Sequence, residues 1–207
     1  MTPPAAPEAD TPTRVLDAAE KAFADQGFAG ARVNGIAAEA GVNKAMLYYY
    51  FESKEGLYRA VFERAFDQIA AAAAAHLSGA TEADILSFLR AYRGILRAHP
   101  HLARLISRDL ADGGAHVVSI LGPRVQGILG GVAGSLGQGM ASGRFNPDIN
   151  PLVAMPVLVA PFVFFALASP MLTAATGVPA DAMAEPFDRT AEAILLRGLL
   201  ARAPEAS

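Results

Sequence analysis

The sequence predicts an all-α protein, because its apolar residues recur with the helical period along the chain. Two further observations favour this fold class. No convincing run alternates apolar and polar residues with the period of two that a strand shows. Capping residues and glycine or proline stops divide the periodic stretches into helical lengths. With 207 residues, the chain could hold one large domain or two small ones.

The composition excludes several kinds of chemistry. The chain is 53% hydrophobic and only 18% charged, so membrane segments have to be considered. It has no cysteine, which excludes disulfides, zinc–thiolate sites and thiol nucleophiles. Its four histidines are scattered, so we expect no metal and no cofactor. The N-terminus lacks the basic and apolar regions of a signal peptide. We therefore expect residues 1–11 to form a disordered arm and the protein to be cytoplasmic.

The first part of the chain predicts a series of short helices. In TPTRVLDAAEKAFADQG, Thr11 can cap a helix that has Pro12 at its first position, and Gly27 can end it in the left-handed conformation. Three short helices with a glycine-containing turn between the second and third form the helix-turn-helix pattern. The later helices are expected at about 33–40, 43–51 and 53–76, the last two with Asn43 and Ser53 as their cap residues.

Three consecutive tyrosines stand in the third predicted helix. Consecutive helical side chains point about 100° apart, so the three rings cannot share one face. If Leu47 and Phe51 face the core, Tyr49 points outward. An outward stripe of this kind suits a DNA major groove, because lysine and phenol groups can bond phosphates or base edges. A surface aromatic cluster or a partner contact explains the same pattern. The stripe consists of Lys44, Ala45, Tyr48 and Tyr49.

Lys54 stands in the first turn of the fourth predicted helix, where a cation opposes the helix dipole. This unfavourable interaction costs about 0.3 kcal/mol or slightly more. A phosphate bound at the helix N-terminus would explain why a lysine stands there. The net charge of the chain is −3. Any DNA binding must therefore depend on where its charges lie and not on their sum.

The stretch AEKAFADQGFAGARVNGIAAEAGVNKAMLYYYFESKEGL resembles the DNA-binding domain of the TetR-type (tetracycline repressor-like) transcriptional regulators. The match runs without a gap from about Thr13 to Val61. The resemblance implies a helix-turn-helix domain over residues 12–57, whose fourth helix continues to about 77. A helical effector-binding and dimerisation domain would follow over 78–203. The matching elements are Phe23, Gly27, Phe28, Ile36, Ala37, Ala40, Gly41, Val42, the run from Leu47 to Phe51 and the run from Ser53 to Leu57.

The resemblance also implies which residues bind DNA. Asn34 falls where a residue of the second helix can reach a base edge. Arg32 replaces the Ser or Thr that usually caps this helix, a loss of about 1 kcal/mol. Met46 replaces a frequent Thr and so removes one phosphate contact, and Tyr50 stands where His is common. The implied DNA-binding residues are Arg32, Asn34, Asn43, Lys44, Ala45, Tyr48, Tyr49, Tyr50 and Lys54.

The glycine-rich segment 122–143 is unusual for a helix. It lacks the preceding strand and the Gly-Lys-Ser/Thr ending of a phosphate loop. Each interior glycine costs about 1 kcal/mol relative to alanine. Either neighbouring helices pack very closely here, or the segment is loose and orders when a ligand binds. The histidines at 99, 101 and 116 predict no metal site.

The segment between Asp148 and Asp181 carries no charge and is long enough to span a membrane. However, Pro156, Pro161 and Pro170 interrupt it, and no basic or Trp anchor flanks it. We expect no membrane attachment, but a core helix buried on nearly all sides. The resemblance implies a homodimer interface made by the last two helices, at about 151–175 and 180–201.

The resemblance further implies an effector pocket among the middle helices. Its apolar character would suit a small lipophilic effector. Arg104 is a further polar candidate, although it and Arg108 could instead pair with Asp109 or Asp112. The candidate pocket residues are Leu89, Tyr92, Arg93, Leu105, Ile106, Arg108, Ile128, Met155, Phe162 and Phe165.

We therefore expect a homodimeric regulator, most often a repressor, that binds a palindromic double-stranded operator. A small effector would release it. An enzyme is disfavoured, because no nucleophile, base and orienting group can be assembled from the spacing. The open alternatives are a constitutive regulator without an effector and, more remotely, a membrane-attached or enzymatic helical protein.

Overall fold

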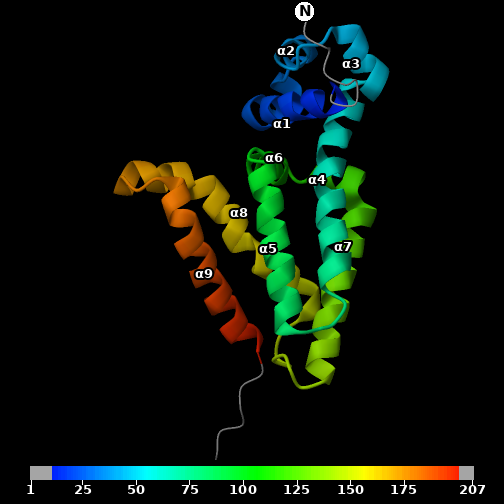
Figure 1. Cartoon of the computed structure of the whole chain (residues 1–207). Coiled ribbons are helices and arrows are strands. Elements are labelled where there is room, and N and C mark those ends of the chain that lie inside the picture. The colour runs from blue at the N-terminus through cyan, green and yellow to red at the C-terminus, as the bar shows by residue number, and fades with distance from the viewer. Residues whose placement is uncertain (1–10, 201–207) are drawn as a thin grey trace, which may run out of the picture. The chain divides into compact units, whose positions relative to one another are not determined.

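The structure is a computed structural model that describes residues 11–200, apart from the side chains of residues 115–117. Over this range the backbone forms nine α-helices and no strand, so the all-α fold class is confirmed (Figure 1). The helices are α1 (Thr11–Gly30), α2 (Val33–Glu39), α3 (Lys44–Phe51), α4 (Lys54–His76), α5 (Glu82–Ala98), α6 (Leu102–Ala111), α7 (Ala115–Ala141), α8 (Pro151–Thr176) and α9 (Ala180–Leu199).

The chain divides into two compact units. The first contains α1 to α3, α4 up to Phe66, α6 from Arg104 onward and α7 up to Gly122. The second contains the rest of α4, α6 and α7 together with α5, α8 and α9. The boundaries expected at residues 57 and 78 stay predictions. Residues 1–10, which belong to the expected disordered arm, and residues after 200 lie outside the described part of the chain, while Thr11 already belongs to α1.

The backbone of α1 leaves the helical conformation at Gly27, where the sequence predicted the helix to end, and a further helical turn continues to Gly30. Gly27 has φ 73° and ψ 172°, a conformation that glycine adopts without steric cost. Ahead of the kink, Val15, Ala19 and Phe23 are fully buried. The predicted break at Gly27 is therefore present with a positive φ, and the short helical turn that follows it was not predicted.

The starts of the next helices follow their capping residues, as predicted. The Asn43 side chain accepts a hydrogen bond from the Met46 backbone N–H at 2.7 Å. Ser53 Oγ accepts one from the Gly56 N–H at 2.9 Å. Arg32 occupies the cap position of α2 and makes no side-chain cap bond, which confirms the expected loss. The caps of Asn43 and Ser53 mark where α3 and α4 begin.

In the second unit, the glycine-rich segment forms the continuous helix α7 up to Ala141. A Cβ added at Gly122, Gly127, Gly130, Gly131, Gly134 or Gly137 would meet no atom within 4 Å. At Gly139 it would lie 2.1 Å from the buried ring of Phe145. Within the described chain, close packing therefore accounts for Gly139 and for none of these six glycines.

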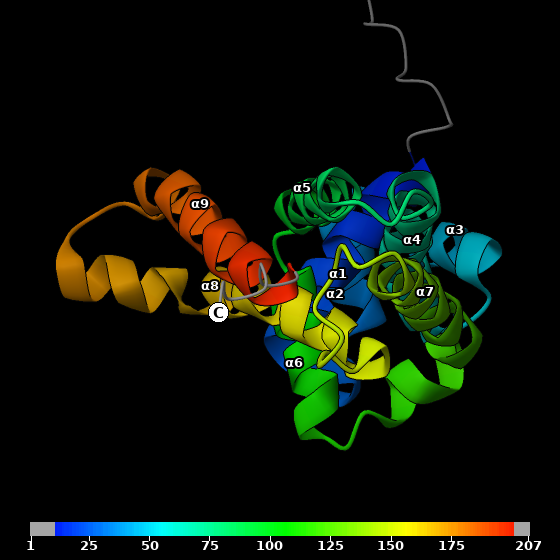
Figure 2. The same ribbon diagram turned by 90° about the horizontal axis from the view of Figure 1, so that it is seen from below.

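Helix α8 is mostly exposed within the single chain, so the expectation of a helix buried on nearly all sides is wrong at this level. By length and composition it is the one helix among the described residues that could cross a membrane. Its ribbon bends before the turn at Gly177, and it contains Pro156, Pro161 and Pro170. Figure 2 shows α8 and α9 joined as a hairpin.

Candidate nucleic-acid interface and effector pocket

The third helix presents the side chains that its periodicity predicts. Leu47 is completely buried, Phe51 is half-buried, and Tyr49 is 81% exposed on the opposite side. Lys44 and Ala45 are also exposed, and Tyr48 is half-buried. An eight-residue helix with one buried and one open face can enter a groove without losing its own core contact.

The polar groups on this face lie close to the aromatic rings. Lys44 Nζ lies 5.5 Å from the centre of the Tyr48 ring. The rings of Tyr49 and Tyr50 meet edge to face, with their centres 5.3 Å apart. These contacts hold a cation and phenol hydroxyls on one surface, where they can donate hydrogen bonds to phosphate oxygens or base edges.

The two candidate residues of the α2 region lie elsewhere on the same unit. Arg32 and Asn34 are exposed and line a cavity of about 410 Å³ between α1 and α2. Lys21 and Glu39, which pair at 3.0 Å, line the same cavity. The DNA-binding roles of Arg32 and Asn34 remain predictions, since exposure alone assigns neither residue to a base or a phosphate.

Lys54 has protein partners that the sequence did not reveal. Its Nζ donates a hydrogen bond to the Ala29 carbonyl at 3.3 Å and lies 4.9 Å from the centre of the Phe28 ring. A carbonyl and an aromatic face both stabilise an ammonium group. These contacts explain why a cation is tolerated in the first turn of α4. The unfavourable interaction of Lys54 with the helix dipole is therefore no longer evidence for a bound phosphate.

Helix α6 holds the kink of α1. Arg108 Nη1 donates to the carbonyls of Ala24 and Asp25 at 3.2 and 3.0 Å. A Cβ at Gly27 would lie 2.9 Å from Arg108 Nε, so glycine also makes room for this side chain. Arg104 pairs with Asp25 at 2.7 Å. Arg108 was a candidate for the effector pocket; the structure instead places its guanidinium on α1.

Buried Tyr58 lies in the aromatic core of this unit. Its ring meets Phe23 edge to face at 4.8 Å and Phe62 at 5.0 Å. Burial, followed by the charges of Asp109 and Asp112, raises the pKa of Tyr58 to about 12. The phenol therefore stays neutral at physiological pH.

The second unit contains a cavity of about 500 Å³ between α5, α8 and α9. This volume is typical of small-molecule sites. Three of the candidate pocket residues, Arg93, Phe162 and Phe165, line it together. The other lining residues are Leu96, Arg97, Ala166, Ala180, Asp181, Ala184, Glu185 and Asp188. The sequence did not predict that any of the four charged residues in this set would line a cavity.

The remaining candidates are dispersed. Leu89, Tyr92 and Leu105 are buried core residues, and burial raises the pKa of Tyr92 to about 12. Ile128 lines a separate groove of about 340 Å³ between α4 and α7. Ile106 and Met155 are half-buried. Helical periodicity identified buried positions, but it does not distinguish a filled core from a cavity wall.

Among the described residues, no group of three or more His, Asp or Glu side chains could hold a metal ion. Buried His99 is 3.1 Å from the side-chain amide of Gln68, as an inter-helix corner would allow. The side chain of His116 lies outside the described residues.

Comparison with known proteins agrees with this geometry. Residues 15–61, which include α2 and α3, match the family model of bacterial regulatory proteins of the tetR family. The chain is 30% identical over 164 residues to the HTH-type transcriptional regulator RutR of Escherichia coli, covering 79% of this chain and 77% of RutR. It is also 30% identical over 149 residues to the HTH-type transcriptional repressor NicS of Pseudomonas putida, covering 67% and 68%.

The solved structures include a putative transcriptional regulator, SCO4942, of Streptomyces coelicolor. It superposes with a TM-score of 0.70 at 25% identity and covers 91% of this chain and 98% of its own. The helix-turn-helix unit and the length of these matches lead to one assignment. The chain belongs to the TetR family of helix-turn-helix transcriptional regulators.

Proposed function

We propose that this regulator is a cytoplasmic homodimeric repressor without enzymatic activity, which binds a palindromic operator through α3 and leaves it when a small lipophilic effector binds. The observation that carries the proposal is the two-sided third helix, with Leu47 fully buried and Tyr49 81% exposed. The name of NicS as a repressor supports the sign of regulation.

On DNA, the surface that faces the groove consists of Lys44, Ala45, Tyr48 and Tyr49. The phosphate contacts are Tyr49, Tyr50 and Lys54. Asn43 uses its side-chain oxygen for the helix cap, which leaves its amide N–H groups free to donate to a phosphate. The proposed contact set is Arg32, Asn34, Asn43, Lys44, Ala45, Tyr48, Tyr49, Tyr50 and Lys54.

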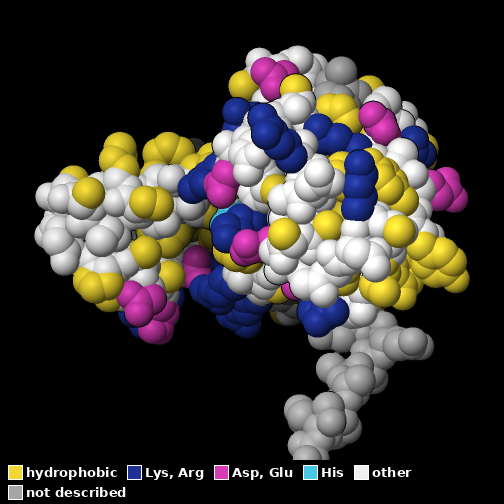
Figure 3. All heavy atoms as spheres, turned by 90° about the horizontal axis from the view of Figure 1, so that it is seen from above, with side chains coloured by type: hydrophobic (Ala, Val, Ile, Leu, Met, Phe, Trp, Pro, Cys, Tyr) yellow, Lys and Arg dark blue, Asp and Glu magenta, His cyan; other side chains and the backbone are white. Residues whose placement is uncertain are grey.

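The apolar surface of α8 and α9 supports a homodimer. Large contiguous apolar surfaces are rare on soluble monomers and mark interfaces. Figure 3 shows hydrophobic side chains over the lobe that these helices form, on the left of that view. Two copies related by a two-fold axis would bury this surface and present two α3 helices to two half-sites. The exposed apolar residues are Leu152, Val153, Val157, Phe164, Leu167, Met171, Val178 and Ile194.

The cavity between α5, α8 and α9 supports an effector, because it combines an apolar wall with a few polar groups. An effector that binds better to one dimer geometry than to the DNA-bound one lowers the affinity for the operator by the same coupling free energy. A constitutive regulator would bind the operator equally well with and without any ligand of this cavity.

The test is selection of genomic DNA fragments by the purified protein at near-physiological salt. We expect enrichment of one short palindrome whose half-sites are about one helical turn apart. A folded, soluble protein that enriches no common sequence would overturn the proposal of an operator-binding repressor.

A further inference from the structure

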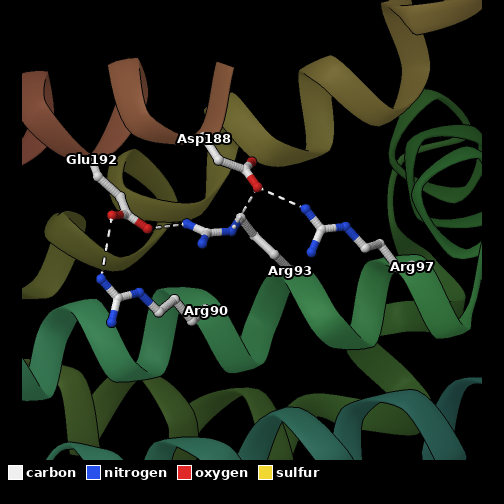
Figure 4. Close-up of polar contacts among 5 residues, drawn as sticks. All are labelled: Arg90, Arg93, Arg97, Asp188 and Glu192. Carbon is white, nitrogen blue, oxygen red and sulfur yellow. Dashed lines mark hydrogen bonds and ion pairs between the residues drawn. The ribbon is translucent and has the colours of Figure 1, made fainter. Parts of the chain in front are cut away.

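Five side chains form a row of alternating charges between α5 and α9 (Figure 4). Arg97 contacts Asp188 at 2.7 Å, and Asp188 also lies 3.1 Å from Arg93 Nε. Arg93 then pairs with Glu192, whose other oxygen lies 3.8 Å from Arg90. The row therefore runs from one cation to another through two carboxylates.

The spacing of the residues explains the row. On α5 the three arginines stand at positions i, i+3 and i+7, and on α9 the two carboxylates stand at i and i+4, so each set shares one helix face. Arg93 and both carboxylates are only 12–15% exposed, while the two end arginines are each 62% exposed. The middle of the row is thus shielded and its ends are open.

The row carries one positive charge more than its carboxylates neutralise. Three guanidinium groups share two carboxylates. The pairing is also incomplete inside the row, since Arg93 Nε is buried and makes no hydrogen bond although Asp188 is near it. Each guanidinium has five N–H donors, and Arg97 uses one of them on Asp188. Arg97 therefore keeps donors that an anionic ligand could use.

Only one end of the row opens into the cavity of about 500 Å³. Arg97 and Arg93 line it, whereas Arg90 does not. The facing wall is apolar and aromatic: Phe162 lies 5.3 Å from the Arg93 guanidinium, and Phe165 stacks on Phe187 at 4.4 Å. A ligand in this cavity would meet the open cation and an aromatic surface together.

Two acidic residues also line the cavity, but both are engaged. Asp181 lies in the first turn of α9, where the helix dipole favours an anion, and it accepts a hydrogen bond from the Ala182 N–H. Glu185 is strongly exposed and pairs with Arg189 at 3.5 Å. Both acidic side chains are exposed to solvent, and Arg97 is the exposed cation of the cavity lining that keeps N–H donors for a ligand.

We propose that the effector of this protein is an amphipathic monoanion, whose carboxylate or sulfonate pairs with Arg97 and whose apolar body lies on Phe162 and Phe165. The proposal rests on the effector-responsive function above and adds the chemical class of the effector. Arg97 binds the acid group through the donors that Asp188 leaves free, in the two-pronged geometry that guanidinium and carboxylate groups favour.

The test compares two fluorescent probes with the same rings. 1-Anilinonaphthalene-8-sulfonate carries one negative charge, and 1-anilinonaphthalene carries none. Titrated into the full-length protein without DNA, the sulfonate should bind about tenfold or more tightly than the neutral probe, because a charge-assisted pair replaces a neutral contact. Arg97→Gln should remove this preference and leave the binding of the neutral probe unchanged.

Two matched controls locate the site. Arg90→Gln changes an arginine of equal exposure at the other end of the row, outside the cavity, and should leave both affinities unchanged. Phe165→Ala should weaken both probes, whereas Leu110→Ala should weaken neither, because exposed Leu110 does not line the cavity. Circular dichroism confirms that each variant is folded.

Equal affinity for the two probes in the wild-type protein would overturn the proposal. So would an Arg90→Gln effect as large as that of Arg97→Gln, or loss of binding in Leu110→Ala alone. Operator release is then measured separately. Binding with the expected variant pattern but without release would uphold the site chemistry and contradict the effector part of the proposed function. If the neutral probe released the protein from the operator as efficiently as the sulfonate, the proposal that the effector is an anion would be contradicted.

Discussion

Two alanine substitutions in α7 should change the stability in opposite directions. At Gly139, a new Cβ would lie 2.1 Å from Phe145 Cδ2 and 2.4 Å from Cε2. The ring has little room to move, since Phe145 is completely buried and its backbone bridges to Leu200. At Gly134, in the same helix, a new Cβ would meet nothing within 4 Å.

The magnitudes follow from two terms. Replacing an interior helical glycine by alanine gains about 1 kcal/mol at either position. At Gly139, overpacking opposes this gain with about 1–3 kcal/mol. Gly134→Ala should therefore raise the free energy of unfolding by about 1 kcal/mol, and Gly139→Ala should lower it by up to about 2 kcal/mol. For a chain of this size, 1 kcal/mol corresponds to about 2–4 °C in Tm.

Urea unfolding followed by circular dichroism, at one fixed protein concentration, measures both changes. Phe145→Leu in the Gly139→Ala background is the matched control, because a smaller side chain should relieve part of the loss. Stabilisation by both substitutions, or an equal loss in both, would refute the account of why Gly139 differs from the other glycines.

Three further changes test other contacts. Lys54→Ala should weaken binding to all DNA sequences alike and reduce the salt slope by about 1, measured by titration at several salt concentrations; a changed sequence preference would make Lys54 a base reader. Arg108→Ala should lower the free energy of unfolding by about 1–3 kcal/mol in urea, because the Ala24 and Asp25 carbonyls lose a charged donor; an unchanged midpoint would contradict that role. Tyr92 has a pKa raised from 10.0 to about 12, so its neutral form favours the folded state, and wild-type stability should fall as pH rises from 10 through 12. Tyr92→Phe should reduce that fall by up to about 3 kcal/mol, and identical alkaline profiles would contradict the burial argument.

The sequence predicts what depends on neighbouring residues. Asn43 and Ser53 cap their helices through bonds to residues three positions away, so the starts of α3 and α4 could be predicted. The outward direction of Tyr49 follows from its spacing to Leu47. The roles of the DNA-binding residues come from the family resemblance and stay predictions.

What depends on distant contacts could not be predicted. Lys54 contacts the Ala29 carbonyl, and Arg108 reaches α1 from α6, more than eighty residues along the chain. Neither contact leaves a periodic signal. The same holds for the row between α5 and α9, in which Arg93 was a pocket candidate but Asp188 and Glu192 were not. Periodicity shows which residues of α5 share one face of the helix, but it does not identify the residues of another helix that contact this face.

The most direct test of the central claim is the affinity of Tyr49→Ala for the DNA fragment that the wild-type protein selects. Because Tyr49 is 81% exposed, the substitution should leave helicity and dimerisation unchanged. A lost groove contact costs about 1–3 kcal/mol, so the affinity should fall by about fivefold or more. Unchanged affinity in a folded dimer would show that α3 does not read DNA.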